Sequence, residues 1–95
     1  MDLVGLRKQI YSICEESGIA MLWVFGSVVR GEDRPESDVD VLVRFKNPVG
    51  LLELIRLEDR FEEALGRKVD LEVEGSLHPL IQAEASRDLK IVYES

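Results

Sequence analysis

The stretch FGSVVRGEDRPESDVDVLVRF, residues 25–45, determines how this chain folds and what kind of site it carries. It contains a Gly26-Ser27 pair, then ten residues, then Asp38-Val39-Asp40. Because Gly has no Cβ, a Gly-Ser turn can bring backbone N–H groups and a hydroxyl close to a phosphate. Side chains alternate along a strand, so Asp38 and Asp40 point to the same face.

Two carboxylates on one face repel each other unless a cation lies between them. Mg²⁺ prefers oxygen ligands, commonly one or two carboxylates together with substrate phosphates. The stretch therefore predicts a site for Mg²⁺ and a nucleoside triphosphate. A DxD motif alone would be weak evidence for such a site, because solvated aspartates are common at strand ends. Haloacid dehalogenase-type phosphatases also use a DxD motif, in which an aspartate is the nucleophile. Those phosphatases lack the preceding Gly-Ser turn, and the EF-hand, Walker A and GxGxxG patterns are absent here.

A third carboxylate is predicted from the strand KVDLEVE, residues 68–74. Its apolar side chains alternate with acidic ones, so Asp70 lies opposite the apolar face. In strand 39–45 the same alternation places Asp38 and Asp40 opposite the valines. If the two strands are neighbours, all three carboxylates gather on one open side of a sheet. Three carboxylates suit a site for two metal ions about 3.5–4 Å apart.

One helix is predicted before the first strand, residues 19–25, and another after it in the sequence. The N-terminal helix covers residues 2–17, with Asp2 as a possible N-cap and Gly18 as its stop. A short helix from Ser27 to Arg30 follows the Gly-Ser turn, and its N-terminus would point toward a phosphate.

A second long helix is predicted from Pro48 to about Leu65, with Asn47 as its N-cap. Leu52 and Ile55 lie beside its apolar stripe, so they could either widen the core face or meet a partner. The stripe itself consists of Leu51, Leu54, Leu57, Phe61, Ala64 and Leu65.

The pattern ends with a helix from about His78 to Arg87 and a strand from Lys90 to Tyr93. We expect an α/β fold, a small mixed sheet of three or four strands with helices packed on one face. Residues 1–95 are expected to form a single domain.

Composition limits the classes of function. The chain is 45% hydrophobic and 33% charged, as expected for an ordinary globular protein. Its net charge of −7 argues against binding a nucleic-acid backbone, and no apolar run approaches the ~20 residues of a membrane span. The N-terminus has no secretory signal pattern, so a cytoplasmic protein is expected. The single cysteine, Cys14, is expected to be buried.

The segment GSVVRGEDRPESDVDVLV resembles the signature of the DNA polymerase β-type nucleotidyltransferase superfamily, and the chain is most similar to its minimal nucleotidyltransferases (MNT). One departure is Val28, where many relatives carry Arg. Asp70 fits the third carboxylate of the family. The residues that match the signature in order are Gly26, Ser27, Arg30, Gly31, Ser37, Asp38 and Asp40.

This resemblance implies that ATP binds through Gly26, Ser27, Arg30 and Ser37. From the residues alone, Arg30 could instead bridge to Glu32 or Asp33 on the surface, and Ser37 could brace the loop. Two Mg²⁺ ions would be held by Asp38, Asp40 and Asp70, which also form the expected catalytic set, and Asp70 would activate the acceptor hydroxyl.

The resemblance also implies a setting. MNT proteins act as antitoxins of HEPN-domain toxins, which they adenylylate on a tyrosine, so a hetero-oligomer with such a partner is expected. Two alternatives stay open. The protein could neutralise its partner by occlusion with catalysis lost, or it could transfer a nucleotide to a small molecule, as aminoglycoside nucleotidyltransferases do with an additional substrate domain.

Overall fold

The structure is a computed structural model, and it describes residues 2–75 and 88–95. Within these residues, one mixed four-stranded sheet has the order β3-β2-β1-β4. Strand β2 is parallel to β3 and antiparallel to β1, which is antiparallel to β4. The elements are α1 (Leu3–Glu16), β1 (Ile19–Phe25), α2 (Ser27–Arg30), β2 (Val39–Phe45), α3 (Leu51–Leu65), β3 (Val69–Val73) and β4 (Lys90–Glu94).

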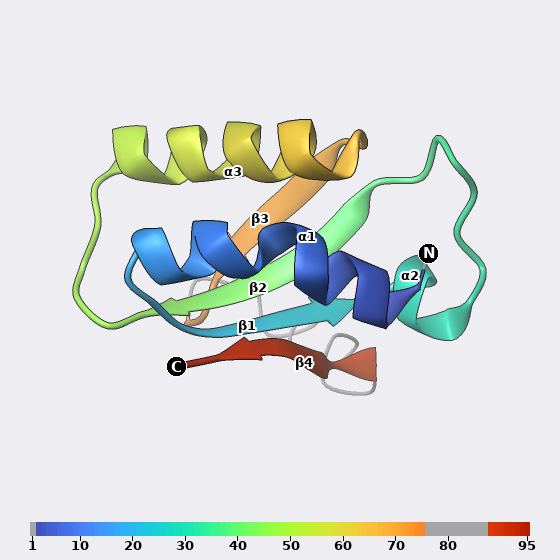
Figure 1. Ribbon diagram of the computed structural model, residues 1–95, viewed down its shortest axis with the longest axis horizontal. Coiled ribbons are helices and arrows are strands. Elements are labelled where there is room, and N and C mark those ends of the chain that lie inside the picture. Colours follow the sequence, from blue (N-terminus) through green and yellow to red (C-terminus); the bar gives the residue numbers. More distant parts are fainter. Residues whose placement is uncertain (1, 76–87) are drawn as a thin grey trace.

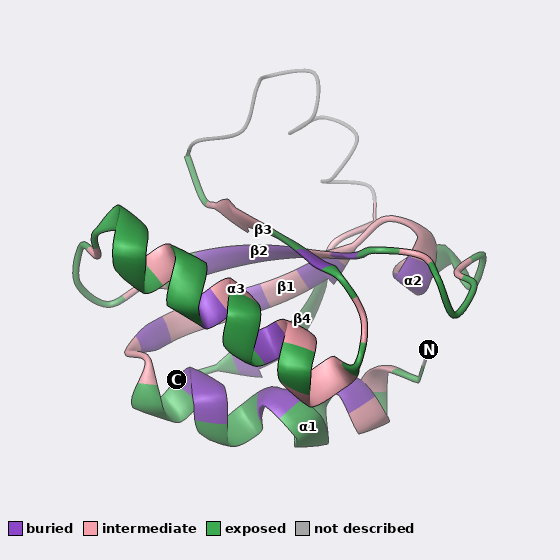
Figure 2. Cartoon of the chain, turned by 90° about the horizontal axis from the view of Figure 1, so that it is seen from above, coloured by how far each residue is buried: buried purple, intermediate pink, exposed green. Residues whose placement is uncertain are grey.

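Helices α1 and α3 cover one face of the sheet (Figures 1 and 2). The valines of β2 turn toward them, since Val39, Val41 and Val43 are all buried. From the helices, Phe61 of α3 and Cys14 of α1 enter the same core. Burial of this apolar surface is the main favourable term that holds helices and sheet together. The α/β class and the one-sided helix layer predicted from the sequence are confirmed.

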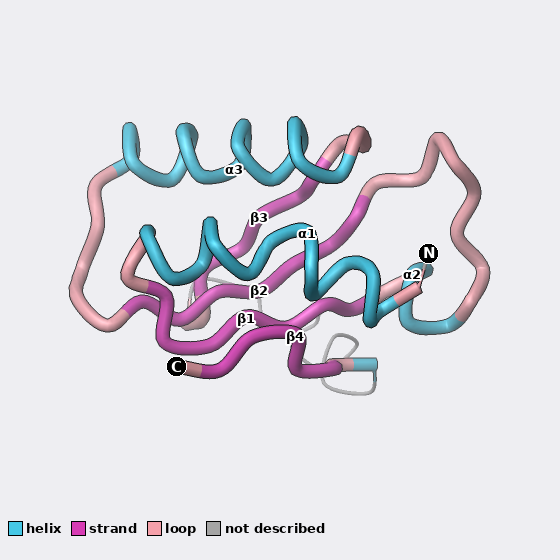
Figure 3. Tube along the Cα trace, in the orientation of Figure 1, coloured by secondary structure: helices cyan, strands magenta, loops and turns pink. Residues whose placement is uncertain are grey.

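Helix α1 begins as predicted, because the Asp2 carboxylate accepts a hydrogen bond of 3.2 Å from the Val4 N–H. It ends at Glu16, and Gly18 follows with a φ of 66° before β1. The tight connection returns the chain beneath α1 as β1, one of the two inner strands of the sheet (Figure 3).

The predicted start of the second long helix is wrong by three residues. Gly50 is the N-cap, with an extended backbone, and its carbonyl accepts the first helical hydrogen bond from Leu54 at 3.2 Å. Residues 46–50 instead carry the chain from the end of β2 to the helical layer, as the loop in Figure 1 shows. A Pro at the first helical position is a frequent local preference, but here the distance between the layers sets the start of the helix.

Three apolar residues of the first turns of α3 remain outside the core. Leu51, predicted in the core stripe, is 72% exposed, and Leu52 and Ile55 are exposed too, so they do not widen the core face. Helical spacing assigns a residue to a face, but it does not say how far along the helix the sheet reaches. The buried part of the stripe is centred on Leu57 and Phe61.

The outer edge of β3 is bonded by two carboxylates of α3. The Val69 N–H donates to Glu62 Oε2 at 2.9 Å, and the Leu71 N–H donates to Glu58 Oε2 at 3.4 Å. Glu58 and Glu62 are one helical turn apart, so they match alternate N–H groups of the strand. These bonds protect an edge strand and fix β3 against α3.

The predicted C-terminal strand is confirmed as β4, whereas the predicted helix from His78 to Arg87 lies outside the described residues. Among the helices of the described ranges, none combines the length and the apolar character needed to cross a bilayer.

Candidate active site

The three predicted carboxylates come from two neighbouring strands. Asp40 of β2 and Asp70 of β3 are register partners in the parallel pair. Directly opposed residues of neighbouring strands project from the same face, so the two side chains share the face that the helices leave uncovered. Asp38 precedes β2 by one residue and, by alternation, lies on that face as well. The condition posed by the sequence, that the two strands be neighbours, is met.

Gly26 lies on the other side of Asp40. It directly follows β1, whose last residue Phe25 is the register partner of Asp40, and its backbone has φ 79° and ψ −147°. A Cβ at this position would be 2.5 Å from Asp40 Oδ2. Two independent restraints therefore require Gly here: a conformation essentially reserved for Gly, and a carboxylate in contact with its backbone.

The Gly-Ser turn leads into α2, as predicted. The carbonyl of Gly26 accepts hydrogen bonds from the N–H groups of Val29 and Arg30, at 3.1 and 3.2 Å. Val28, the position at which many relatives carry Arg, is 3% exposed and belongs to the core. In this chain position 28 therefore supplies an apolar side chain to the core rather than a cation to the site.

Burial raises the pKa of Asp40, the charges of Asp70 and Asp38 raise it further, and Arg30 opposes them. Glu72 follows Asp70 on the same face, and its pKa is raised first by burial and then by Asp70, Asp40 and Glu58. The carboxylates are thus close enough to resist one another's ionisation. A bound cation would relieve this repulsion.

The donor set fits Mg²⁺ in its chemistry, because it consists of carboxylate oxygens. In the described ranges, however, no group of three or more His, Cys, Asp or Glu side chains is arranged to hold a metal ion as it stands. Asp38, Asp40 and Asp70 share a face and an electrostatic environment, but they do not converge on one point. Rotation of exposed side chains such as Asp38 and Asp70 would be needed to surround an ion.

Arg30, a predicted phosphate ligand, is engaged in two ion pairs. Its Nε lies 3.1 Å from Glu32 Oε2, and its Nη1 lies 2.8 Å from Asp88 Oδ2. The alternative in which Arg30 bridges to Glu32 is therefore the arrangement present in the structure. The side chain is still 45% exposed and lowers the pKa of Asp40, so it lies at the border of the site.

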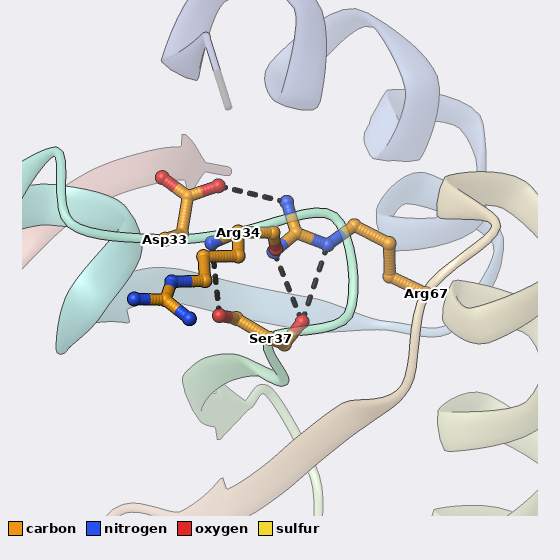
Figure 4. Close-up of polar contacts among 4 residues, drawn as sticks. All are labelled: Asp33, Arg34, Ser37 and Arg67. Carbon is orange, nitrogen blue, oxygen red and sulfur yellow. Dashed lines mark hydrogen bonds and ion pairs between the residues drawn. The ribbon is translucent and has the colours of Figure 1, made fainter.

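Ser37 braces the loop that leads to Asp38. Its Oγ accepts a hydrogen bond of 2.9 Å from the Arg34 N–H, and its own N–H donates to the Arg34 carbonyl at 2.9 Å. These contacts are the bracing role that the residues alone allowed, and the binding of phosphate by Ser37 stays a prediction. The same turn is held by Arg67, which precedes β3 (Figure 4). Sequence reasoning missed Arg67, because no motif links it to a loop some thirty residues away.

A mixed sheet that places a Gly-Ser turn beside a DxD pair and a third aspartate on the next strand defines a nucleotidyltransferase type of site. Consistent with this, a family model described as "Nucleotidyltransferase domain" matches residues 6–92. The chain belongs to this nucleotidyltransferase family, whose members transfer nucleotidyl groups.

Two relatives support this membership. Protein adenylyltransferase MntA of Thermococcus cleftensis is 42% identical over 78 residues, which cover 82% of this chain and 79% of the relative. MJ0435 of Methanocaldococcus jannaschii, named as a candidate protein adenylyltransferase, is 37% identical over 82 residues, covering 86% of this chain and 88% of the relative.

Solved structures share the fold. A candidate minimal nucleotidyltransferase superposes with a TM-score of 0.77 at 39% identity, covering 95% of both chains. A toxin–antitoxin complex with AMP-PNP gives 0.80 at 19% identity, covering 94% of this chain and 73% of the other. A tri-AMPylated Shewanella oneidensis HEPN toxin in complex with MNT antitoxin gives 0.75 at 16% identity, covering 99% and 74%. The last two, at such low identity, show likeness of fold alone.

Proposed function

We propose that this protein transfers AMP from ATP to a hydroxyl, most simply a tyrosine, of a HEPN-domain partner and acts as its antitoxin. One observation carries the proposal: Asp40 lies between the Gly26 backbone and its register partner Asp70. The triphosphate-binding turn and the metal-binding carboxylates thereby meet at one end of β1, β2 and β3. A cytoplasmic location, where ATP and Mg²⁺ are both available, belongs to this proposal.

In this reaction the acceptor oxygen bonds to the α-phosphorus, and the bond from that phosphorus to the pyrophosphate oxygen breaks. Gly26 and Ser27 hold the phosphates through backbone N–H groups and the hydroxyl. Asp38, Asp40 and Asp70 would hold Mg²⁺, which when bound supplies positive charge to the α-phosphate and the departing pyrophosphate. Asp70 is exposed and can accept the proton of an incoming hydroxyl.

The partner is proposed from the relatives. A HEPN toxin carries AMP groups in the Shewanella complex, and the Thermococcus relative is named a protein adenylyltransferase. Both fit a site on an open face of the sheet, since all described strands belong to the one nucleotidyltransferase sheet and none builds a separate acceptor domain. A protein hydroxyl could reach such a face directly.

Intact-mass spectrometry tests the proposal. The HEPN-domain partner is incubated with this protein, ATP and Mg²⁺, and its mass is expected to rise by one or more AMP units. Omission of Mg²⁺, or addition of EDTA, should leave the mass unchanged. An unmodified partner under conditions in which the two proteins form a stable complex would contradict nucleotidyl transfer.

Occlusion without catalysis is the second candidate function. It is favoured by one observation, the burial of Val28 where many relatives carry a cation. Against it, three acidic side chains on one open face repel one another and are unfavourable to keep unless they bind a cation. The Asp70→Asn variant described in the Discussion separates the two functions.

A further inference from the structure

We propose that Arg67 is a positioning residue that holds the backbone at Asp38, so that rotation of the Asp38 side chain is enough to reach a metal ion, an inference that rests on the function proposed above. Arg67 touches neither the carboxylates of the site nor the Gly-Ser turn in any contact that the structure records. It acts through the loop of residues 31–38, which joins α2 to β2 and ends at Asp38.

One guanidinium makes four contacts with this loop (Figure 4). Its Nη1 lies 2.9 Å from Asp33 Oδ2. Its Nη2 donates to the Arg34 carbonyl at 2.5 Å and to the Ser37 carbonyl at 3.0 Å, and Nε donates to the same Ser37 carbonyl at 3.2 Å. The contacts reach the loop near its beginning, at its turn and directly before Asp38. Only the planar fork of an arginine supplies donors in these directions together.

These contacts fix the backbone on one side of Asp38, and β3 fixes it on the other. The preceding residue, Ser37, is held by Arg67 through its carbonyl. The following residue, Val39, donates its N–H to the carbonyl of Lys68 at 2.9 Å. Arg67 and Lys68 are the residues that lead into β3 and so into Asp70. The positions of Asp38 and Asp70 are therefore linked through two adjacent residues.

The Arg67–Asp33 pair differs from the other ion pairs of the described residues in its burial. The side chains of Arg67 and Asp33 are 10% and 6% exposed, whereas those of Arg60 and Glu16, which also form a pair, are 45% and 61% exposed. Exposed pairs contribute little, but breaking a buried pair leaves a charge without compensation. Arg60 is therefore a matched control, because it is also an arginine in an ion pair, but its pair, between α1 and α3, is exposed.

The consequence concerns metal binding more than the fold. Asp38 is exposed and lies before β2, so neither side-chain packing nor strand pairing of its own backbone orients it. If Arg67 no longer holds the loop, the backbone at Asp38 loses conformational entropy when an ion binds, and the affinity for the ion falls. Outer-shell partners of metal ligands typically change metal affinity by about 10–100-fold when they are altered. We expect Arg67→Lys, which keeps the charge but loses the fork, to fall in the lower part of that range.

The test compares wild type, Arg67→Lys and Arg60→Lys. Amide hydrogen exchange is measured over residues 31–38 and over α1, and Mn²⁺ binding is measured by calorimetry with a non-hydrolysable ATP analogue present. In wild type, the Nε–H resonance of Arg67 should exchange with water far more slowly than that of Arg60. Arg67→Lys should show faster exchange in the loop but not in α1, and about tenfold weaker Mn²⁺ binding. AMP transfer by Arg67→Lys should be slower than in wild type at low Mg²⁺ and should recover at high Mg²⁺. Arg60→Lys should match wild type in amide exchange of the loop, in Mn²⁺ affinity and in AMP transfer.

Three results would overturn the inference. One is a fast-exchanging Arg67 Nε–H in wild type; another is unchanged loop exchange in Arg67→Lys; a third is faster exchange with unchanged Mn²⁺ affinity. If Arg67→Lys does not fold, Asp33→Asn removes the charge at the other end of the pair and is judged by the same readouts. Failure of the wild type to bind Mn²⁺ would overturn the proposed function together with this inference, whereas equal binding by wild type and variant overturns the inference alone.

Discussion

Asp40 and Asp70 face each other directly across the parallel strands β2 and β3, at the end of the sheet where β1 reaches Gly26. The two carboxylates lie close together, and Asp40 is partly buried. Burial, followed by repulsion from Asp70, raises the pKa of Asp40. A fold that only needed stability would gain by replacing either residue. The arrangement is explained if a cation and a polyphosphate bind there, as the proposed function requires.

The combined variant Asp38→Asn with Asp40→Asn should abolish Mg²⁺-dependent AMP transfer while leaving the fold intact. Asparagine keeps the shape of each side chain but removes the charge that holds the ion. Transfer is followed by intact-mass spectrometry of the partner, and folding by far-UV circular dichroism. Transfer at the wild-type rate would contradict the catalytic assignment of these aspartates.

Asp40→Asn alone should raise the melting temperature at pH 7 in buffer with EDTA. The pKa of Asp40 is raised in the folded state, so its contribution to stability is fully present below the unfolded pKa and is lost as the pH rises through the folded pKa. At pH 7 the ionised carboxylate therefore destabilises the fold, and asparagine removes that effect. The gain should shrink toward zero below about pH 4, near the ordinary pKa of an aspartate. Asp59→Asn, on the exposed side of α3, serves as the control; an equal gain there would refute the explanation.

Gly26→Ala and Gly31→Ala separate strain from obstruction. Both glycines have positive φ, 79° and 72°, so both variants should lose roughly 1–3 kcal/mol of stability. Only at Gly26 does the new Cβ meet a carboxylate, at 2.5 Å from Asp40 Oδ2, while Gly31 has nothing within 4 Å. Gly26→Ala should therefore also lose ATP binding and transfer. Calorimetry that finds the same ATP affinity in both variants would place the nucleotide elsewhere.

Asp70→Asn should spare association with the HEPN-domain partner but stop its modification. The substitution keeps the size and the exposed position of the side chain in β3 and removes a metal-binding charge. Cells that carry the toxin should lose protection although the two proteins still co-purify. Full protection without added mass on the partner would favour occlusion instead.

Cys14 should be inert toward thiol reagents until the protein unfolds. The side chain is fully buried, and burial raises the pKa of its thiol from 9.0 to about 12. Because the folded pKa is raised, the contribution of Cys14 to stability is present below pH 9 and is lost as the pH rises toward 12. Denaturant titrations at pH 8 and pH 10.5 should show a larger loss of stability for wild type than for Cys14→Ala. Rapid modification of the native protein at pH 8 would contradict the burial.

Much of the site followed from local sequence rules. Alternation with period two separates Asp38 and Asp40 from the buried valines of β2, and it separates Asp70 from Val69 in β3. The Gly26-Ser27 turn after an apolar strand was also readable, because only Gly supports its conformation. These features depend on a residue and its immediate neighbours.

Other features depend on the whole fold. Which strand pairs with β2, how far α3 reaches over the sheet, and where Val28 points are set by contacts between distant segments. The start of α3 at Leu51 rather than Pro48 belongs to the same group, since the connection between two layers decides it.

The sequence by itself determined the strands, the acidic side of each strand and the Gly-Ser turn, because backbone sterics and side-chain alternation act over one to four residues. The tertiary structure alone decided that Asp40 adjoins Asp70 and that Arg67 grips a loop 30 to 34 residues before it in the chain. Such contacts form only when the parallel pairing of β2 with β3 brings the residues together. No local pattern encodes them, because a single guanidinium gives the same sequence signal at the surface and in a buried pair.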